Sequence, residues 1–293
     1  MTSPAPLDGL HVVSIATNVP GPAAAARLRA LGARVTKVEP PTGDYLAFAA
    51  REWYGALSAG QEVITLDLKS EAGRATLDER LAAADVFVTS HRPSALARLG
   101  LDATSVRARF PRLCVVAIVG ASGERAEVPG HDLTYQAVAG LVVPPLMPLS
   151  LFADLATGEA AATAALSLVV QRARTGAGGA VEVALAHVAE RLAAPRRHGL
   201  TLPTGLLGGA LPVYALYPAT HGWIAVAALE PHFVERLAAG LGLDELTHEG
   251  LSSAFAQRDA AAWEAWGIAH DVPIAAVRVP RGPTPADPSL RSG

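Results

Sequence analysis

The stretch "LHVVSIATNVPGPAAAARLRALGARVTKVEPP" (residues 10–41) decides the fold, because it predicts a strand, a helix and a second strand in direct succession. Residues 10–16 form a short apolar run rich in β-branched side chains, which predicts a buried strand. The helix that follows has Pro22 in its first turn and Gly32 at its end, the positions that these residues favour. Residues 34–41 predict the second strand, ended by two prolines. This order predicts a βαβ unit with parallel strands.

The same alternation continues through the first half of the chain. "EVITLDL" (residues 62–68) predicts another strand, and the helix after it has Ser70 at its N-cap. The apolar runs 85–90 and 113–120 predict two more buried strands. We therefore expect an α/β fold with a Rossmann-like, mostly parallel sheet flanked by helices. In such a fold, ligands bind at the carboxyl ends of the strands.

The second half of the chain predicts a smaller α+β domain. "VYALYPATHGWIAVAAL" (residues 213–229) is typical of a β-hairpin, and amphipathic helices follow it. The predicted organisation is a large α/β domain over residues 1–195, a linker over 196–210, the small domain over 211–276 and a flexible C-terminal tail over 277–293. The tail is expected to be irregular because it is rich in Pro and Gly.

Composition excludes several classes of protein. Apolar residues make up 51% of the 293 residues and charged residues 17%, which indicates a globular protein. A net charge of −3 gives no electrostatic case for nucleic acid. The single cysteine, Cys114, excludes an internal disulfide framework and is expected in a buried strand. The N-terminus does not resemble a signal peptide, and the apolar run 161–170 is expected to fall short of a membrane span. We therefore expect a cytoplasmic protein without a membrane partner.

Three ionisable residues stand at the edges of predicted elements among apolar neighbours: His131, Asp154 and Glu230. From position alone, His131 after Pro-Gly could be a turn residue, and Asp154 and Glu230 could cap the helices that follow them. No His-x-x-x-His or Cys pair supports a metal site, so none is expected. The glycine pattern of dinucleotide-binding turns is absent from "IATNVPGPAAAA", so NAD or FAD binding is not supported. The residues alone leave the capping and the catalytic interpretations open.

A family resemblance favours the catalytic interpretation. Five segments carry it in family order: "PLDGLHVVSIATNVPGPAAAARLRALGARVTKVEPPTGD", "VITLDLKSEAGRATLDERLAAADVFVTSHRPSALARLGLD", "PGHDLTYQAVAGL", "ADLATGEAAATAALSLVVQRARTGAGGAVEVAL" and "GWIAVAALEPHFVERLAAGLGLDE". Together they resemble the class III (CaiB/BaiF) CoA-transferase family over most of the chain. The resemblance implies a CoA-binding large domain, the interlocked homodimer of that family, and acyl-CoA or CoA as the ligand. It implies no cofactor beyond the coenzyme A of the substrate.

Two chemistries occur in this family, and both are carried over to the same positions. Its transferases use the aspartate at the position of Asp154 as a nucleophile that carries the acyl group and then CoA. Its α-methylacyl-CoA racemases use that aspartate together with the histidine of "GHD", here His131, as two bases. "AALEPHF" resembles the racemase branch, in which the glutamate at the position of Glu230 supports the histidine. The resemblance therefore implies a racemase in which His131 and Asp154 exchange protons across the α-carbon of a 2-methylacyl-CoA. A CoA-transferase and a degenerate homologue that no longer binds CoA remain alternatives.

The resemblance also implies a set of CoA contacts and a source of oxyanion donors. The backbone N–H groups at the start of the helix of Asp154 are expected to bind the enolate oxygen. The carried-over CoA contacts are Lys37, Thr65, Leu66, Asp67, Leu68, Arg92, Gly130, Asp132, Leu133, Thr134 and Tyr135.

The chain departs from the family pattern at the cations that bind the CoA phosphates. Gln61 and Glu62 stand where a basic cluster is usual, and Pro40 stands where racemases have an arginine, with Lys37 nearby. Since charge-assisted contacts to phosphate are strong, we expect weakened CoA binding. The loop between His131 and Asp154 is shorter than usual, and most of the C-terminal segment that returns to the large domain is missing. The shortened C-terminus is expected to affect the interlocked dimer.

Overall fold

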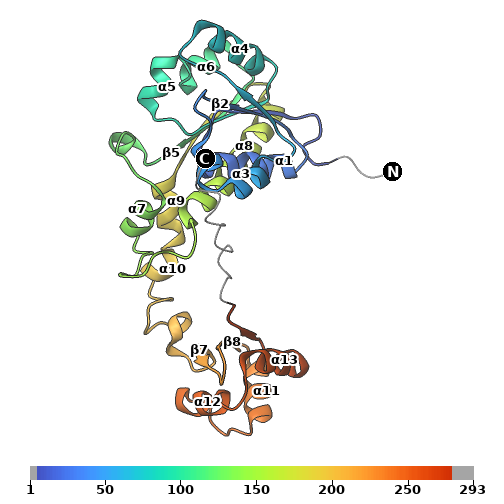
Figure 1. The fold of residues 1–293 in the computed structure, drawn as a ribbon, viewed down its shortest axis with the longest axis vertical. Coiled ribbons are helices and arrows are strands. Elements are labelled where there is room, and N and C mark those ends of the chain that lie inside the picture. Colours follow the sequence, from blue (N-terminus) through green and yellow to red (C-terminus); the bar gives the residue numbers. More distant parts are fainter. Residues whose placement is uncertain (1–4, 279–293) are drawn as a thin grey trace, which may run out of the picture. The chain divides into compact units, whose positions relative to one another are not determined.

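The computed structural model describes residues 5–278, which divide into two compact units. The first unit ends at Ala193 and the second begins at Ala194 (Figure 1). The stretch predicted as a linker contains helical turns, namely α10 (Ala194–Arg197) and a π-helical turn at Leu206–Ala210. Most of the predicted tail, residues 279–293, lies outside the described residues.

A six-stranded parallel sheet forms the centre of the first unit, in the order β3-β2-β1-β4-β5-β6. The chain reverses its direction of winding between β1 and β4, where an open α/β sheet binds its ligands. This confirms the predicted fold class. The strands are β1 (His11–Ser14), β2 (Arg34–Glu39), β3 (Glu62–Thr65), β4 (Val86–Thr89), β5 (Cys114–Val119) and β6 (Ala180–Ala184).

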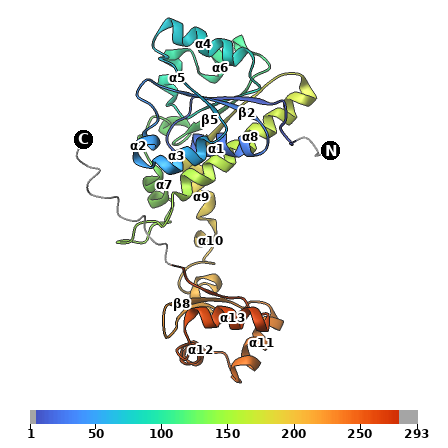
Figure 2. The same cartoon turned by 45° about the vertical axis from the view of Figure 1, so that its right-hand side comes forward.

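Helices cover both faces of this sheet (Figures 1 and 2). Consecutive strand residues point to opposite faces, so Val12 and Val13 belong to two separate hydrophobic cores. Burial on both faces explains why the strands are continuous apolar runs without alternation. On the face of Val12 lie α1 (Pro20–Ala30) and α8 (Phe152–Thr175), with α7 (Asp132–Val138) and α9 (Leu185–Leu192) beside α8. The other face carries α4 (Glu71–Ala82), α5 (Pro93–Leu99) and α6 (Ala103–Arg109).

Local sequence signals account for where the helices start and stop. The hydroxyl of Ser70 accepts the N–H of Gly73 at 3.0 Å, which confirms Ser70 as the N-cap of α4. Gly32 has φ +105° directly after α1, a conformation that other residues adopt only with strain. Gly158 lets α8 approach α1 closely, because a Cβ there would lie 2.8 Å from the Cβ of Ala23. Two short helices, α2 (Tyr45–Ala49) and α3 (Arg51–Ser58), precede β3.

The sequence predicts a long alanine-rich helix over about residues 154–174, and helix α8 confirms it. It contains 24 residues with a mean hydropathy of 1.3 over its apolar window, which is long and apolar enough to cross a membrane. The apolar run 161–170, which is expected to fall short of a membrane span, is one part of this longer helix from Phe152 to Thr175. Its buried face nevertheless packs as a core helix packs: Ala161, Ala165 and Leu168 lie in the hydrophobic core with β1 and α1.

The second unit is built on an antiparallel sheet. As predicted, β7 (Tyr214–Pro218) and β8 (Trp223–Ala227) form a hairpin whose turn contains Gly222 at φ +84°. The third strand, β9 (Ile274–Ala276), pairs with the other edge of β8. Phe255, Trp263 and Trp266 pack into the core of this unit. Besides α10, the described part of this unit contains the helices α11 (Pro231–Leu241), α12 (His248–Phe255) and α13 (Ala260–His270), of which α12 is not expected from the sequence.

Candidate active site

A cavity of about 240 Å³ lies at the carboxyl ends of β1, β4 and β5 in the first unit. This is the end of the sheet at which an α/β fold binds ligands. His131 and Asp154, the predicted catalytic pair, both line it. Five segments contribute polar residues and glycines to its lining. Three of them follow strands: Thr17 and Asn18 after β1, Ser90 and Arg92 after β4, and Gly120 after β5. The other two are the start of α7, with Gly130, His131 and Tyr135, and α8, with Asp154.

Asp154 is the third residue of α8 and does not cap it. The N-cap residue is Leu151, so the capping interpretation of Asp154 is wrong. Its backbone N–H donates to Oδ1 of Asp132 at 3.0 Å. Burial, and in second place the negative charge of Asp132, raise the pKa of Asp154 to about 7. A carboxyl group with this pKa can both give and take a proton near neutral pH.

Asp132 is buried, with 5% of its surface exposed, and both of its oxygens are occupied. While Oδ1 accepts the N–H of Asp154, Oδ2 accepts Nε2 of Gln136, which also donates to the carbonyl of Ser150 at 3.1 Å. These bonds connect α7 to the start of α8. The carboxylate of Asp132 thus holds Asp154, and a contact of Asp132 with CoA stays a prediction. The same bond occupies one of the backbone N–H groups that the sequence assigns to an enolate oxygen.

His131 is the N-cap residue of α7, which fits its interpretation as a turn residue. It also lines the cavity, which fits the catalytic interpretation. Its backbone N–H donates to Oγ1 of Thr134 at 3.0 Å, and that hydroxyl donates to the His131 carbonyl at 2.8 Å. The backbone and Thr134 thus close the helix end between them, which leaves the imidazole exposed and facing the cavity. Leu133 and Thr134 are exposed but do not line the cavity, whereas Gly130 and Tyr135 do.

Glu230 belongs to the second unit, whereas His131 belongs to the first. It is exposed at the N-cap position of α11, and its side chain makes no capping hydrogen bond. A role in supporting His131 stays a prediction.

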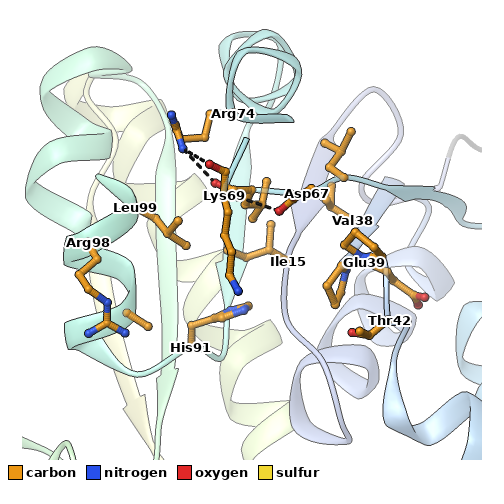
Figure 3. Close-up of a pocket in the computed structure, with 15 residues that line it drawn as sticks. Ile15, Val38, Glu39, Thr42, Asp67, Lys69, Arg74, His91, Arg98 and Leu99 are labelled. Carbon is orange, nitrogen blue, oxygen red and sulfur yellow. Dashed lines mark hydrogen bonds between the residues drawn. The ribbon is translucent and has the colours of Figure 1, made fainter. Parts of the chain in front are cut away.

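A larger cavity, of about 730 Å³, opens at the carboxyl ends of β2, β3 and β4 (Figure 3). Three of the predicted CoA contacts, Leu66, Asp67 and Leu68, line it in the turn after β3. Thr65, the last residue of β3, is not among the lining residues.

Cations that the sequence reasoning did not assign line this larger cavity. Lys69, Arg74 and Arg98 are exposed, and within residues 5–278 none has a carboxylate within 4 Å. Nη1 of Arg74 donates to the carbonyl of Lys69 at 2.8 Å, and the Lys69 side chain extends towards His91 (Figure 3). Burial lowers the pKa of His91. Lys69 and Arg74 closely follow the predicted "LDL" strand, which is the signal that could have identified them.

Gln61 and Glu62, which stand where a basic cluster is usual in the family, lie apart from these cations. Glu62 pairs with Arg80, with 3.2 Å between Oε1 and Nη2, and Gln61 donates to the carbonyl of Leu57 at 2.7 Å. Neither residue lines the larger cavity. The negative charge of Glu62 therefore does not lie in the lining of the larger cavity.

Lys37 is 1% exposed and paired with two carboxylates, and its contact with CoA stays a prediction. Nζ donates to Oε1 of Glu39 at 2.6 Å and to Oδ2 of Asp44 at 2.8 Å, and lies 4.5 Å from the centre of the Tyr54 ring. Burial by itself lowers the pKa of Lys37, but its bonds to Asp44 and Glu39 outweigh burial and raise the pKa overall. Oδ1 of Asp44 also accepts the N–H of Asn18 at 3.1 Å, so this buried network fixes a loop that lines the smaller cavity.

The loop between β4 and α5 borders both cavities. Ser90 and Arg92 line the smaller one, and His91 between them lines the larger one. The Ser90 hydroxyl accepts the N–H of Thr17 at 3.1 Å, which joins this loop to the loop after β1. An elongated ligand with an anionic end and a reactive end can therefore contact both cavities across one loop. Within the described part of the chain no group of three or more His, Cys, Asp or Glu side chains could hold a metal ion.

Comparison with known proteins identifies the family of this chain. Residues 7–291 match CoA-transferase family III. The α-methylacyl-CoA racemase of Homo sapiens is 31% identical over 263 residues, 83% of this chain and 67% of that protein. The cinnamoyl-CoA:phenyllactate CoA-transferase of Clostridium sporogenes is 28% identical over 270 residues, 82% of this chain and 65% of that protein. The chain thus spans about two thirds of the length of these relatives.

Solved structures agree with the sequence comparison. A hypothetical protein from Mycobacterium tuberculosis superimposes with a TM-score of 0.81 at 25% identity, over 94% of this chain and 86% of that chain. A CAIB/BAIF family protein from Brucella suis superimposes with a TM-score of 0.80 at 27% identity, over 94% and 85%. The family comprises both isomerases and transferases of CoA thioesters. The chain belongs to CoA-transferase family III.

Proposed function

We propose that this protein acts on acyl-CoA thioesters, with the CoA phosphates in the larger cavity and the thioester in the smaller one. Three cations of the larger cavity, which pair with no carboxylate among the described residues, support the first placement, because phosphate groups bind most strongly to charged donors. The raised pKa of Asp154 supports the second, because such groups gather at catalytic sites. Arg92 then lies in the smaller cavity, on the loop that borders both.

The reaction that we propose is racemisation or epimerisation at the α-carbon of a 2-methylacyl-CoA. One side chain takes the α-proton from one face while the other gives a proton to the opposite face, so two groups of different protonation state are required. Asp154, with a pKa of about 7, is present in both forms at neutral pH and shares its cavity with the imidazole of His131. This pairing is the observation that carries the proposal. Glu230 is proposed to orient His131.

A CoA-transferase is the second candidate. There Asp154 attacks the thioester carbonyl, CoA leaves as a thiolate, and the acyl group forms an anhydride with the carboxylate. The position of Asp154 in a cavity at the end of the sheet supports this reaction as well.

The degenerate-homologue alternative is weakened by the same cations. It depends on a loss of phosphate contacts at Gln61 and Glu62, whereas Lys69, Arg74 and Arg98 offer positive charge within the larger cavity. We propose no cofactor beyond the coenzyme A of the substrate.

We further propose that the protein is a cytoplasmic homodimer. The loop between α7 and α8 supports the dimer, because it exposes a run of large apolar side chains, of which Leu149 is 99% exposed. Exposed apolar surfaces of this kind are typical of protein interfaces. The other exposed members are Val143, Leu146 and Met147.

The test begins with calorimetric titration of the full chain with acetyl-CoA and then propionyl-CoA at low and moderate salt. We expect micromolar binding that weakens as salt screens the cations. Exchange of the α-proton of 2-methylpropionyl-CoA and (2S)-2-methylbutyryl-CoA in heavy water then separates the two reactions, since transfer requires no loss of this proton. No binding at millimolar ligand would overturn the proposed function, and binding with transfer but no exchange would favour the second candidate.

A further inference from the structure

The hydroxyl of Tyr135 occupies a place that the protein leaves open for it. Tyr135 is the fourth residue of α7, and its half-buried ring packs against the hydrophobic core. The hydroxyl lies so close to Gly120 and Gly130 that a Cβ on either glycine would overlap with it. Both glycines and Tyr135 line the smaller cavity with Asp154. Two glycines thus make room for one hydroxyl group beside the catalytic carboxyl.

Within residues 5–278 no hydrogen bond joins this hydroxyl to the protein. It is also not among the buried side-chain atoms that lack a hydrogen-bond partner, and Tyr135 lines the cavity. Burial, and in second place the negative charge of Asp154, raise the pKa of Tyr135. It therefore remains protonated at neutral pH and serves as a donor, not as a base. A donor that the protein does not use and that lines a catalytic cavity is available to the substrate.

We propose that Tyr135 is a catalytic residue whose hydroxyl donates a hydrogen bond to the thioester carbonyl oxygen of the bound acyl-CoA, a role that rests on the proposed function. When the α-proton leaves, the C–H electron pair forms the Cα–C double bond and the carbonyl π pair moves onto oxygen. When a carboxylate attacks instead, the same π pair moves onto the same oxygen. In both reactions the charge develops where a preorganised donor is most effective.

The Tyr135 hydroxyl matters as a donor because backbone N–H groups near the start of α8 are already bonded within the protein. The backbone N–H of Asp154, which would otherwise be available to an oxyanion, is bonded to Asp132, and the N–H of Leu155 donates to the carbonyl of Leu151 at 2.9 Å. Tyr135 comes from α7 and not α8, so its hydroxyl is independent of these bonds.

The first test is Tyr135→Phe, which keeps the packed ring and removes only the hydroxyl. We expect kcat for α-proton exchange or transfer to fall by roughly 10²–10³-fold, as on removal of one oxyanion donor, while the Kd for acetyl-CoA stays within threefold. The exposed Tyr45→Phe on α2 is the matched control and should keep its rate. Infrared spectra of bound acetyl-CoA labelled with ¹³C at the carbonyl give a readout without turnover. The carbonyl stretch should lie lower in the wild type than in Tyr135→Phe.

The second test is Gly120→Ala, whose methyl group overlaps with the hydroxyl position. It should lower kcat in the wild type but cause little further loss in the Tyr135→Phe background, because both changes act through one group. A Tyr135→Phe protein with wild-type kcat and an unchanged carbonyl stretch would overturn this inference while the proposed function stands. Failure of the wild type to bind any acyl-CoA would instead overturn the proposed function and this role with it.

Discussion

The carboxylate of Asp132 accepts the backbone N–H of Asp154 at 3.0 Å and places a second negative charge beside that buried carboxyl group. Two adjacent carboxylates in a poorly solvated site do not ionise independently, so Asp154 retains its proton up to about pH 7. Burial is the larger cause of the raised pKa of Asp154, and Asp132, which also bonds its backbone N–H, is the second. Two of the predictions below follow from this relationship.

Asp132→Asn should move the pH dependence of the reaction to lower pH. The amide oxygen can still accept the N–H of Asp154, but the like charge is gone, so the pKa of Asp154 falls. Burial continues to hold it above its ordinary value. In the direction in which Asp154 acts as the acid, the decline of kcat with rising pH should begin earlier. A pH profile of α-proton exchange measures this, with Asp78→Asn on α4 as the surface control. An unchanged midpoint would contradict the electrostatic role of Asp132.

Asp154→Asn should stabilise the fold at alkaline pH and not at acidic pH. Because the folded-state pKa of Asp154 is raised above its unfolded value of 3.8, the folded protein binds more protons than the unfolded chain between these values. Stability is therefore lost as pH rises from about 4 through 7. Removing the group should add on the order of 2–4 kcal/mol to the free energy of unfolding at pH 8. Urea denaturation at pH 4.5 and pH 8 measures it; equal effects at both values would refute the assignment.

Lys37→Met should destabilise the first unit strongly. The change leaves Glu39 and Asp44 as buried charges without their counter-ion, which typically costs about 3–5 kcal/mol. Denaturant unfolding of the full chain, followed for the first unit, gives the free energy. The exposed Lys69→Met is the control and should change stability little. A loss below about 1 kcal/mol for Lys37→Met would mean that the network is not structurally required.

Lys69→Met should instead weaken CoA binding and reduce its dependence on salt. Lys69 is exposed in the larger cavity, where its charge can contact a phosphate group. Titration with acetyl-CoA at two salt concentrations should show a several-fold increase in Kd and a smaller change of Kd with salt. Arg80→Met, which removes an exposed cation outside this cavity, should leave both quantities as they are. If the two variants behave alike, the larger cavity is not the phosphate site.

His131→Ala should separate the two candidate reactions. It should abolish α-proton exchange, because one of the two proton-transfer groups is lost, and leave CoA transfer largely intact if transfer is the activity. Asp154→Ala should abolish both, since each reaction requires its carboxyl group. Exchange in heavy water and product analysis measure the two activities in parallel. Undiminished exchange in His131→Ala would exclude the two-base mechanism.

Much of the fold could be predicted from the sequence, because its elements are specified locally. The apolar runs and prolines of residues 10–41 define a strand, a helix and a strand whose bounds the structure confirms to within a few residues. Ser70 caps its helix with its own hydroxyl, and Gly222 forms the hairpin turn through its own backbone. Helix α12 has a capping residue, Thr247, but its short apolar face gives a weak periodic signal.

The site depended on tertiary structure, because it is assembled by segments far apart in the chain. From the sequence, Lys37 and Asp132 are merely charged residues in the correct motifs, and only folding shows that both are buried and fully bonded. Lys69 and Arg98 are 29 positions apart in numbering, yet they line one cavity, because parallel strands bring their carboxyl ends to one edge of the sheet. Local sequence thus determined the elements, and the family resemblance of the sequence implied the candidate pair His131 and Asp154. Only tertiary packing decided which charged groups are buried away from water. It therefore decided which of them stabilise the fold and which remain exposed to a ligand.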